Sequence, residues 1–307
     1  MKYNGQVSGR DAELSLEKEG LRLGSRFLDY AEVASLRPVN HRVWVTTLEG
    51  EAIEISMLGF SFDGFWEELT DLFGQRSRQA LFIEEPLVTL SEGEYRTPAE
   101  SGRGKIALFE DSVCILPETC NAVRIPLCFT EEIRVKGYEL TFTTAAGDRY
   151  IVARMGYDTQ PFAERVVQFS QRVKKERARA LEQISLQEPF TVKGLFRIRH
   201  PEQSWQAAFG DHCCAVELFA GEDAATYLYR FEGDREAFLY RLEEALEAMG
   251  PHREIIYWTQ EQINEKPLYC MALRRSRAVG FLRERSAGRL IHSESHREKL
   301  QAFLHPS

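Results

Sequence analysis

The sequence has no long apolar segment. Its apolar runs stay well below the roughly 18 residues that a membrane-spanning helix requires. The first residues, MKYNGQVSGRDAELSL, also lack the apolar stretch of about 7 to 15 residues that a signal peptide contains. We therefore expect a cytoplasmic protein without a transmembrane segment.

Motifs for common metal, nucleotide and nucleophile sites are missing as well. None of the six cysteines forms a C-x-x-C pair, so a structural zinc site has no support. Neither G-x-x-x-x-G-K-[ST], nor a strand-linked G-x-G-x-x-G, nor G-x-S-x-G occurs. We expect no cofactor and no metal, and we expect the cysteines to be small core residues.

Negative charge outnumbers positive charge except near the C-terminus. The net charge is −8, yet residues 251–307 carry ten Lys or Arg against six Glu, which leaves −12 for residues 1–250. An acidic body repels phosphate groups, so nucleic acid or anionic lipid is not expected as the main partner. Any such contact would involve residues 251–307.

Two segments of the sequence repeat 97 residues apart. Residues 46–65 (TTLEGEAIEISMLGFSFDGF) align without a gap to residues 143–162 (TTAAGDRYIVARMGYDTQPF). Each segment has a hairpin signal around a glycine, followed by one face of an amphipathic helix. The apolar helix faces are Phe65, Leu69, Leu72 and Phe73 in the first copy, and Phe162, Val166, Phe169 and Val173 in the second.

Short strands are predicted before each repeated segment. In the first copy, Leu14 and Leu16 alternate before the turn Glu19-Gly20, and further strands are expected at 26–30, 32–36, 43–45 and 53–55. Asp63 is expected to cap the helix. The corresponding early strands of the second copy align at an offset of 92, which predicts a five-residue insertion near residues 117–121.

These patterns predict an α+β fold with mainly antiparallel strands. We expect a first domain at 1–82, a linker at 83–103, a second domain at 104–186 with an extended helix, and a third α+β domain at 187–307. The third has a hairpin around residues 215–231 and a helix through Phe238, Leu242, Leu246 and Met249. This order leaves open that the third domain contains a divergent third copy of the repeated unit. A weaker, partial fourth repeat would comprise a strand at 279–282, a strand at 290–291 and a final helix.

The order of short strands, glycine-aromatic pair and final amphipathic helix resembles the pleckstrin-homology-like (PH-like) superfold, in its bacterial and GRAM-like forms. The resemblance covers about residues 10–80 and 103–180. It implies tandem seven-stranded barrels, each capped by a C-terminal helix, and a role as binding modules. Lipid-binding members place Lys and Arg in the first hairpin loop, whereas residues 17–20 (EKEG) and 109–112 (FEDS) carry carboxylates here. Phosphoinositide binding is therefore not expected.

The densest basic cluster is the candidate partner-binding site. It comprises Arg274, Arg275 and Arg277, with Arg283, Arg285 and Arg289 along an expected hairpin. The cluster is suited to dock on the acidic first 250 residues, on an acidic partner or on phosphates. Charge reversal at the first three arginines is expected to weaken partner binding and to leave thermal stability nearly unchanged.

Three functions are compatible with these observations. The first is a non-enzymatic protein-interaction module or scaffold, because binding-type domains repeat and no catalytic motif is found. The second is association with a membrane surface or nucleic acid through residues 251–307, which steep salt dependence would reveal.

The third is an enzyme with a site at a domain interface, using His212, His292 and His296. A capping box, S-x-x-E, is predicted to start a helix at Ser295, which separates His292 from His296 and argues against a helical metal pair. On a strand at 212–214, only Cys214 would share a side with His212.

Overall fold

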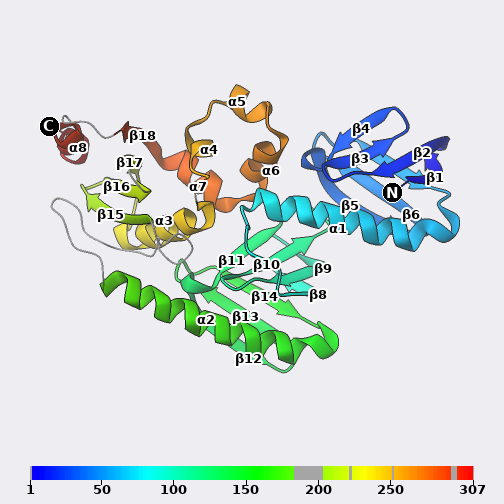
Figure 1. Cartoon of the computed structure of the whole chain (residues 1–307), viewed down its shortest axis with the longest axis horizontal. Coiled ribbons are helices and arrows are strands. Elements are labelled where there is room, and N and C mark those ends of the chain that lie inside the picture. The colour runs from blue at the N-terminus through cyan, green and yellow to red at the C-terminus, as the bar shows by residue number, and fades with distance from the viewer. Residues whose placement is uncertain (1, 183–202, 221–222, 251, 292–295, 307) are drawn as a thin grey trace.

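A computed structural model describes residues 2–182, 203–220, 223–250, 252–291 and 296–306 of the chain. The fold is α+β, and its strands pair antiparallel in three sheets within these residues (Figure 1). Two sheets have seven strands each and one has four. Residues 2–82, 83–182 and 203–306 are called the first, second and third parts below.

The first part forms a seven-stranded sheet followed by one long helix. The strand order is β4-β3-β2-β1-β7-β6-β5. The elements are β1 (Lys2–Val7), β2 (Arg10–Leu16), β3 (Gly20–Leu23), β4 (Arg26–Asp29), η1 (Tyr30–Glu32), β5 (Val33–Val39), β6 (Arg42–Thr47), β7 (Ala52–Ser56), η2 (Gly59–Ser61) and α1 (Phe62–Ala80). Ser61, not Asp63, is the N-cap residue of α1, and its side chain makes no capping hydrogen bond.

The second part has the same order of elements and the corresponding strand order, β11-β10-β9-β8-β14-β13-β12. Its elements are β8 (Thr89–Arg96), β9 (Ser101–Leu108), β10 (Ser112–Pro117), β11 (Val123–Pro126), η3 (Leu127–Phe129), β12 (Thr130–Lys136), β13 (Glu139–Thr144), β14 (Arg149–Ala153), η4 (Gly156–Asp158) and α2 (Thr159–Glu182). The predicted extension of this helix beyond residue 182 lies outside the described residues.

Strand registers correspond between the two sheets. The pair Leu36↔Val45 has its counterpart 97 residues later in Ile133↔Phe142. Before that point the offset is 92, because Leu14↔Leu23 corresponds to Ile106↔Ile115. The change from 92 to 97 falls between β10 and β11, which confirms the predicted five-residue insertion near 117–121.

The expected linker at 83–103 is wrong for residues 89–96, which form β8, and for residues 101–103, which begin β9. The strand β1 was not predicted either. Both strands contain a glycine that lies tightly against a neighbouring strand. A Cβ atom on Gly5 would lie 2.8 Å from the Ser56 carbonyl oxygen, and one on Gly93 would lie 2.8 Å from that of Ala153. In β8 the inward positions include Ser91 and Gly93, and in β1 Gly5 lies between the inward Tyr3 and Val7, so the run of large apolar residues that marks a strand is interrupted.

The third part has a four-stranded sheet of order β15-β16-β17-β18, unlike the two larger sheets. Its elements are β15 (Gln203–Phe209), β16 (Cys213–Ala220), β17 (Asp223–Arg230), α3 (Arg235–Met249), α4 (Glu254–Tyr257), α5 (Gln260–Asn264), α6 (Pro267–Arg275), α7 (Arg277–Arg285), β18 (Ser286–Ile291) and α8 (His296–Leu304). The expected strand at 279–282 is wrong, since it lies in α7. Val279 and Leu282 are both buried, and a spacing of three places them on one helix face.

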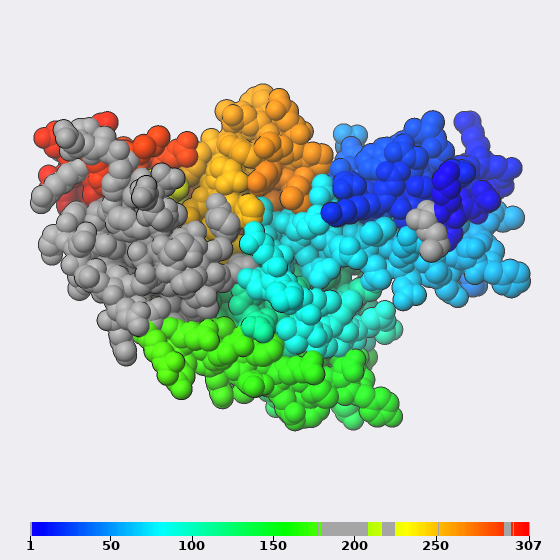
Figure 2. Space-filling view, viewed as in Figure 1, coloured from blue at the N-terminus to red at the C-terminus, as the bar shows by residue number. Residues whose placement is uncertain are grey.

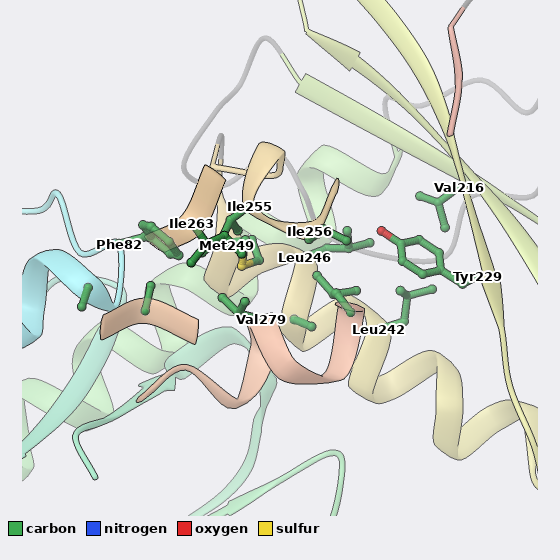
Figure 3. Close-up of a cluster of buried hydrophobic side chains, with 14 of the residues drawn as sticks. Phe82, Val216, Tyr229, Leu242, Leu246, Met249, Ile255, Ile256, Ile263 and Val279 are labelled. Atoms are coloured by element: carbon green, nitrogen blue, oxygen red, sulfur yellow. The ribbon is translucent and has the colours of Figure 1, made fainter. Parts of the chain in front are cut away.

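The three parts pack against each other through apolar contacts. Helix α1 contacts β10 of the second part and α6 of the third (Figure 1). The largest core cluster joins α3–α7 to Ala31, Ala80 and Phe82 of the first part, and Figure 3 shows Phe82 beside Ile263 and Met249. In the space-filling view, the orange segment of the third part lies against the end of the cyan α1 (Figure 2).

Candidate functional site

The arginine segment lies at the corner where α6 ends and α7 begins, between the first and second parts. Arg275 is 5% exposed and reaches the first part, where its Nη2 donates to the carbonyl oxygens of Tyr30 (3.3 Å) and Val33 (3.1 Å). Its guanidinium carbon lies 5.3 Å from the centre of the Phe73 ring. Burial lowers the pKa of Arg275 to about 10, so the side chain stays charged at neutral pH.

Arg277 faces the second part instead. Its Nη1 donates to the Tyr150 hydroxyl (3.2 Å) and lies 3.3 Å from Asp148 Oδ2. Arg241 of α3 also lies 3.3 Å from this carboxylate oxygen. Glu244 lies on α3, as Arg241 does. Burial and the nearby Asp148 raise the pKa of Glu244 to about 7. Two guanidinium groups and two carboxyl groups therefore meet at the junction of α3, α7 and the turn before β14.

The other four predicted arginines do not form one exposed surface with these two. Arg283 donates to the carbonyl oxygens of Ile255 (2.5 Å) and Trp258 (3.0 Å) inside the third part. The remaining three differ in their surroundings: Arg285 packs over the Phe281 ring, Arg289 lies over the Tyr257 ring, and Arg274 is exposed without an ion pair to a described residue. The expectation that Arg275 is dispensable for stability is contradicted by its burial.

A cavity of about 540 Å³ lies at this junction. Its walls come from the β10–β11 connection, the turn before β14, α3, and the α6–α7 corner, with Leu81 at the end of α1. Six arginines line it, namely Arg124, Arg241, Arg274, Arg275, Arg277 and Arg285. Sequence reasoning identified four of them and missed Arg124 and Arg241, which lie far from residues 274–285 in the chain and carry no motif.

A second feature is the edge of the first sheet, where β5 pairs with the insertion of the second part. The Leu36 amide donates to the Glu118 carbonyl oxygen (2.7 Å), and the Cys120 amide donates to the Ala34 carbonyl oxygen (2.8 Å). Ser35 and Thr119 form an antiparallel bridge. This edge therefore accepts a short extended segment as an additional strand.

The corresponding edge of the second sheet is open within the described part of the chain. Strand β12 ends its sheet and pairs there only with β13. Because its register matches that of β5, the Ile133 amide points out of the sheet as the Leu36 amide does. Five of the seven residues of β12 are exposed. Val135 lies two residues after Ile133, so its amide also points out of the sheet. The equivalent residue of β5 is Pro38, which has no amide hydrogen, so β12 has one outward donor more than β5.

The expected histidine site is not assembled among the described residues. His296 interacts with Thr226 Oγ1, whereas the His212 carbonyl accepts from the Phe231 amide. Thr226 and Phe231 are separated by about 16 Å of extended chain. His292 lies outside the described residues, as does Ser295, the expected cap of α8.

Cys214 is fully buried while His212 is exposed, and burial raises the pKa of the Cys214 thiol. No group of three or more His, Cys, Asp or Glu side chains suited to a metal ion is found within the described residues. Within the same residues, no helix combines the length and apolarity needed to span a bilayer. Comparison with protein-family models and with curated proteins gave no match to this chain.

Proposed function

We propose that this chain is a non-enzymatic protein-interaction module built from two PH-like units, and that the β12 edge binds an extended segment of a partner protein. The pairing of β5 with residues 118–120 carries the proposal, because the same edge position already accepts a strand within this chain. The equivalent strand order, the matching registers and the helix after each seventh strand support the assignment of both units to one PH-like fold.

Strand addition suits the composition of β12. Its exposed side chains are those of Val135 and of four charged residues, Glu131, Glu132, Arg134 and Lys136, so a partner strand would find carboxylates near one end and cations near the other. Main-chain hydrogen bonds supply affinity in this binding mode, and alternate side chains supply specificity. Helix α2 contacts β12, so a bound strand would run beside a helix.

The substitution Val135→Pro tests the proposal, because it removes one outward amide. The first unit already has proline at the equivalent position, Pro38, so the backbone tolerates this residue and the variant should fold. A photo-crosslinking residue in place of Arg134 would trap strands bound at this edge in native lysate. We expect a discrete crosslinked protein, and we expect Val135→Pro to reduce its yield by roughly two- to tenfold, because the loss of one neutral main-chain hydrogen bond costs about 0.5–1.5 kcal/mol.

Lys136→Gln is the matched control, since it changes an exposed side chain on the same strand and leaves the main chain intact. Strand addition would be refuted by equal crosslinking in wild type and Val135→Pro, when circular dichroism shows that both proteins are folded. Loss of crosslinking in Lys136→Gln alone, together with strong salt dependence, would point to a charge-driven contact instead.

A further inference from the structure

We propose that the cavity between the second part, α3 and the α6–α7 corner binds a small organic phosphate monoester. This site is separate from the β12 edge. Its volume of about 540 Å³ lies in the range of small-molecule sites, which is roughly 300–1,000 Å³. Phe281, Leu273 and Ala245 line part of it, so the ligand has an apolar body besides its anionic group.

Charge in the cavity favours an anion. Three carboxyl groups, Asp148, Glu244 and Glu284, line it beside the six arginines. Outside the lining, Asp111 and Glu85 lie 2.8 and 4.0 Å from Arg124. Six guanidinium groups therefore face five carboxyl groups, and the surplus of positive charge grows when Glu244 is protonated.

Helix α7 adds to this preference at its N-terminus. Ser276 caps the helix by accepting from the Val279 amide (3.4 Å), and Ser276, Arg277 and Ala278 all line the cavity. The first amides of a helix have no acceptor inside the helix, and the helix dipole is positive at this end. Phosphate groups are commonly bound in this arrangement.

Structural roles account for only some of these arginines. Arg274 and Arg275 lie at the C-terminal end of α6, where cations stabilise a helix. Arg275 is held by its two carbonyl acceptors, and its Nε, which has no hydrogen-bond partner among the described residues, is buried away from solvent. Arg274 makes no hydrogen bond or ion pair with a described residue, although it lines the cavity. Arg274 is therefore the position where a bound oxyanion finds donors that the described part of the protein does not use.

The test is calorimetric titration of the full chain with phenyl phosphate at low salt, beside inorganic phosphate, benzoate and phenol. We expect saturable binding of phenyl phosphate, weaker binding of phosphate and benzoate, and no binding of phenol. Arg274→Gln should weaken phenyl phosphate at least about tenfold, the effect of losing one charge-assisted hydrogen bond. Arg289→Gln removes an exposed arginine outside the cavity and should change nothing.

Several results would overturn the proposal. One is binding of phenyl phosphate that does not saturate up to about 10 mM, because a dissociation constant above that value corresponds to a binding free energy of only a few kcal/mol. Another is equal weakening by Arg274→Gln and Arg289→Gln, which would mean general attraction to positive charge. Co-sedimentation with phosphatidic acid vesicles, without binding of soluble phenyl phosphate, would assign the phosphate to a lipid surface and exclude the cavity as a site for a soluble phosphate monoester.

Discussion

Removing Arg275 should weaken the attachment of the third part to the first. In Arg275→Ala, the carbonyl groups of Tyr30 and Val33 lose the hydrogen bonds from the guanidinium group, while the Tyr30 oxygen keeps the one from the Val33 amide, and the contact over the Phe73 ring is lost. A hydrogen bond to a charged group contributes about 1.5–3 kcal/mol, and a cation over a ring contributes about 0.5–2 kcal/mol. Burial of the charge costs several kcal/mol in the wild type, and the variant avoids this cost, which offsets part of the lost interaction energy. We expect a net destabilisation of about 2–4 kcal/mol.

The variant Arg275→Met separates these contributions. Methionine keeps most of the apolar stem and removes the buried charge, so its cost should be smaller, about 1–2 kcal/mol. Arg274→Ala is the matched control, because this exposed neighbour makes no hydrogen bond or ion pair with a described residue, and its effect should stay within about 0.5 kcal/mol.

Urea unfolding followed by circular dichroism measures these differences. With a slope of about 3 kcal/mol per molar urea, Arg275→Ala should lower the midpoint by roughly 1 M. Hydrogen exchange at the amides of β5 should also accelerate, because opening of this region becomes easier. A midpoint for Arg275→Ala equal to that of Arg274→Ala would refute the reasoning, and it would show that the buried guanidinium group is stabilised no better than an exposed one.

Two further predictions concern the core and pH. Gly93→Ala should destabilise by about 1–3 kcal/mol, since the new methyl group meets backbone, whereas Gly64→Ala in α1 has free space and should be neutral or stabilising in thermal unfolding. The carboxylates of Glu254 and Glu84 lie 3.9 and 3.1 Å from the His252 ring and raise the pKa of His252, so its stabilisation is complete below the unfolded value and disappears as pH rises through the raised pKa. The melting temperatures of wild type and His252→Gln should therefore differ more at about pH 5.5 than at about pH 9, and a gap that grows with pH would contradict this.

Strands with alternating large apolar residues could be predicted from the sequence, and strands without them could not. Leu14, Leu16, Leu21 and Leu23 are all buried, as the alternation indicated. In β8, buried residues alternate with more exposed ones. The buried residues include Ser91 and Gly93, however, and neither has a large apolar side chain that would reveal the alternation in the sequence. A glycine that lets two strands approach closely appears in the sequence as a turn signal, so this strand looked like a linker.

The candidate site was harder to predict because it depends on contacts between distant segments. Arg275 hydrogen-bonds to residues more than 240 positions away, so its burial depends on how α6 packs on η1. The run Arg274, Arg275, Ser276, Arg277 reads as one exposed basic patch, yet a helix end lies within it. That change of direction sends Arg275 toward the first part and Arg277 toward the second. Charge density along the chain therefore says little about which arginines are free.

The five-residue insertion is where the two repeated units differ in ways that bear on both proposals. Within it, Thr119 bridges to Ser35 and closes the β5 edge. Thr119 and Asn121 both donate to Glu100, at 2.8 and 2.5 Å, which anchors the insertion on its own sheet, and Asn121 also lines the cavity. Because β3 and β4 of the first unit are joined by a short turn, that unit offers no equivalent segment to cover β12. One insertion thus fastens the two units together, covers the β5 edge while the equivalent β12 edge stays open within the described residues, and forms a wall of the proposed anion site.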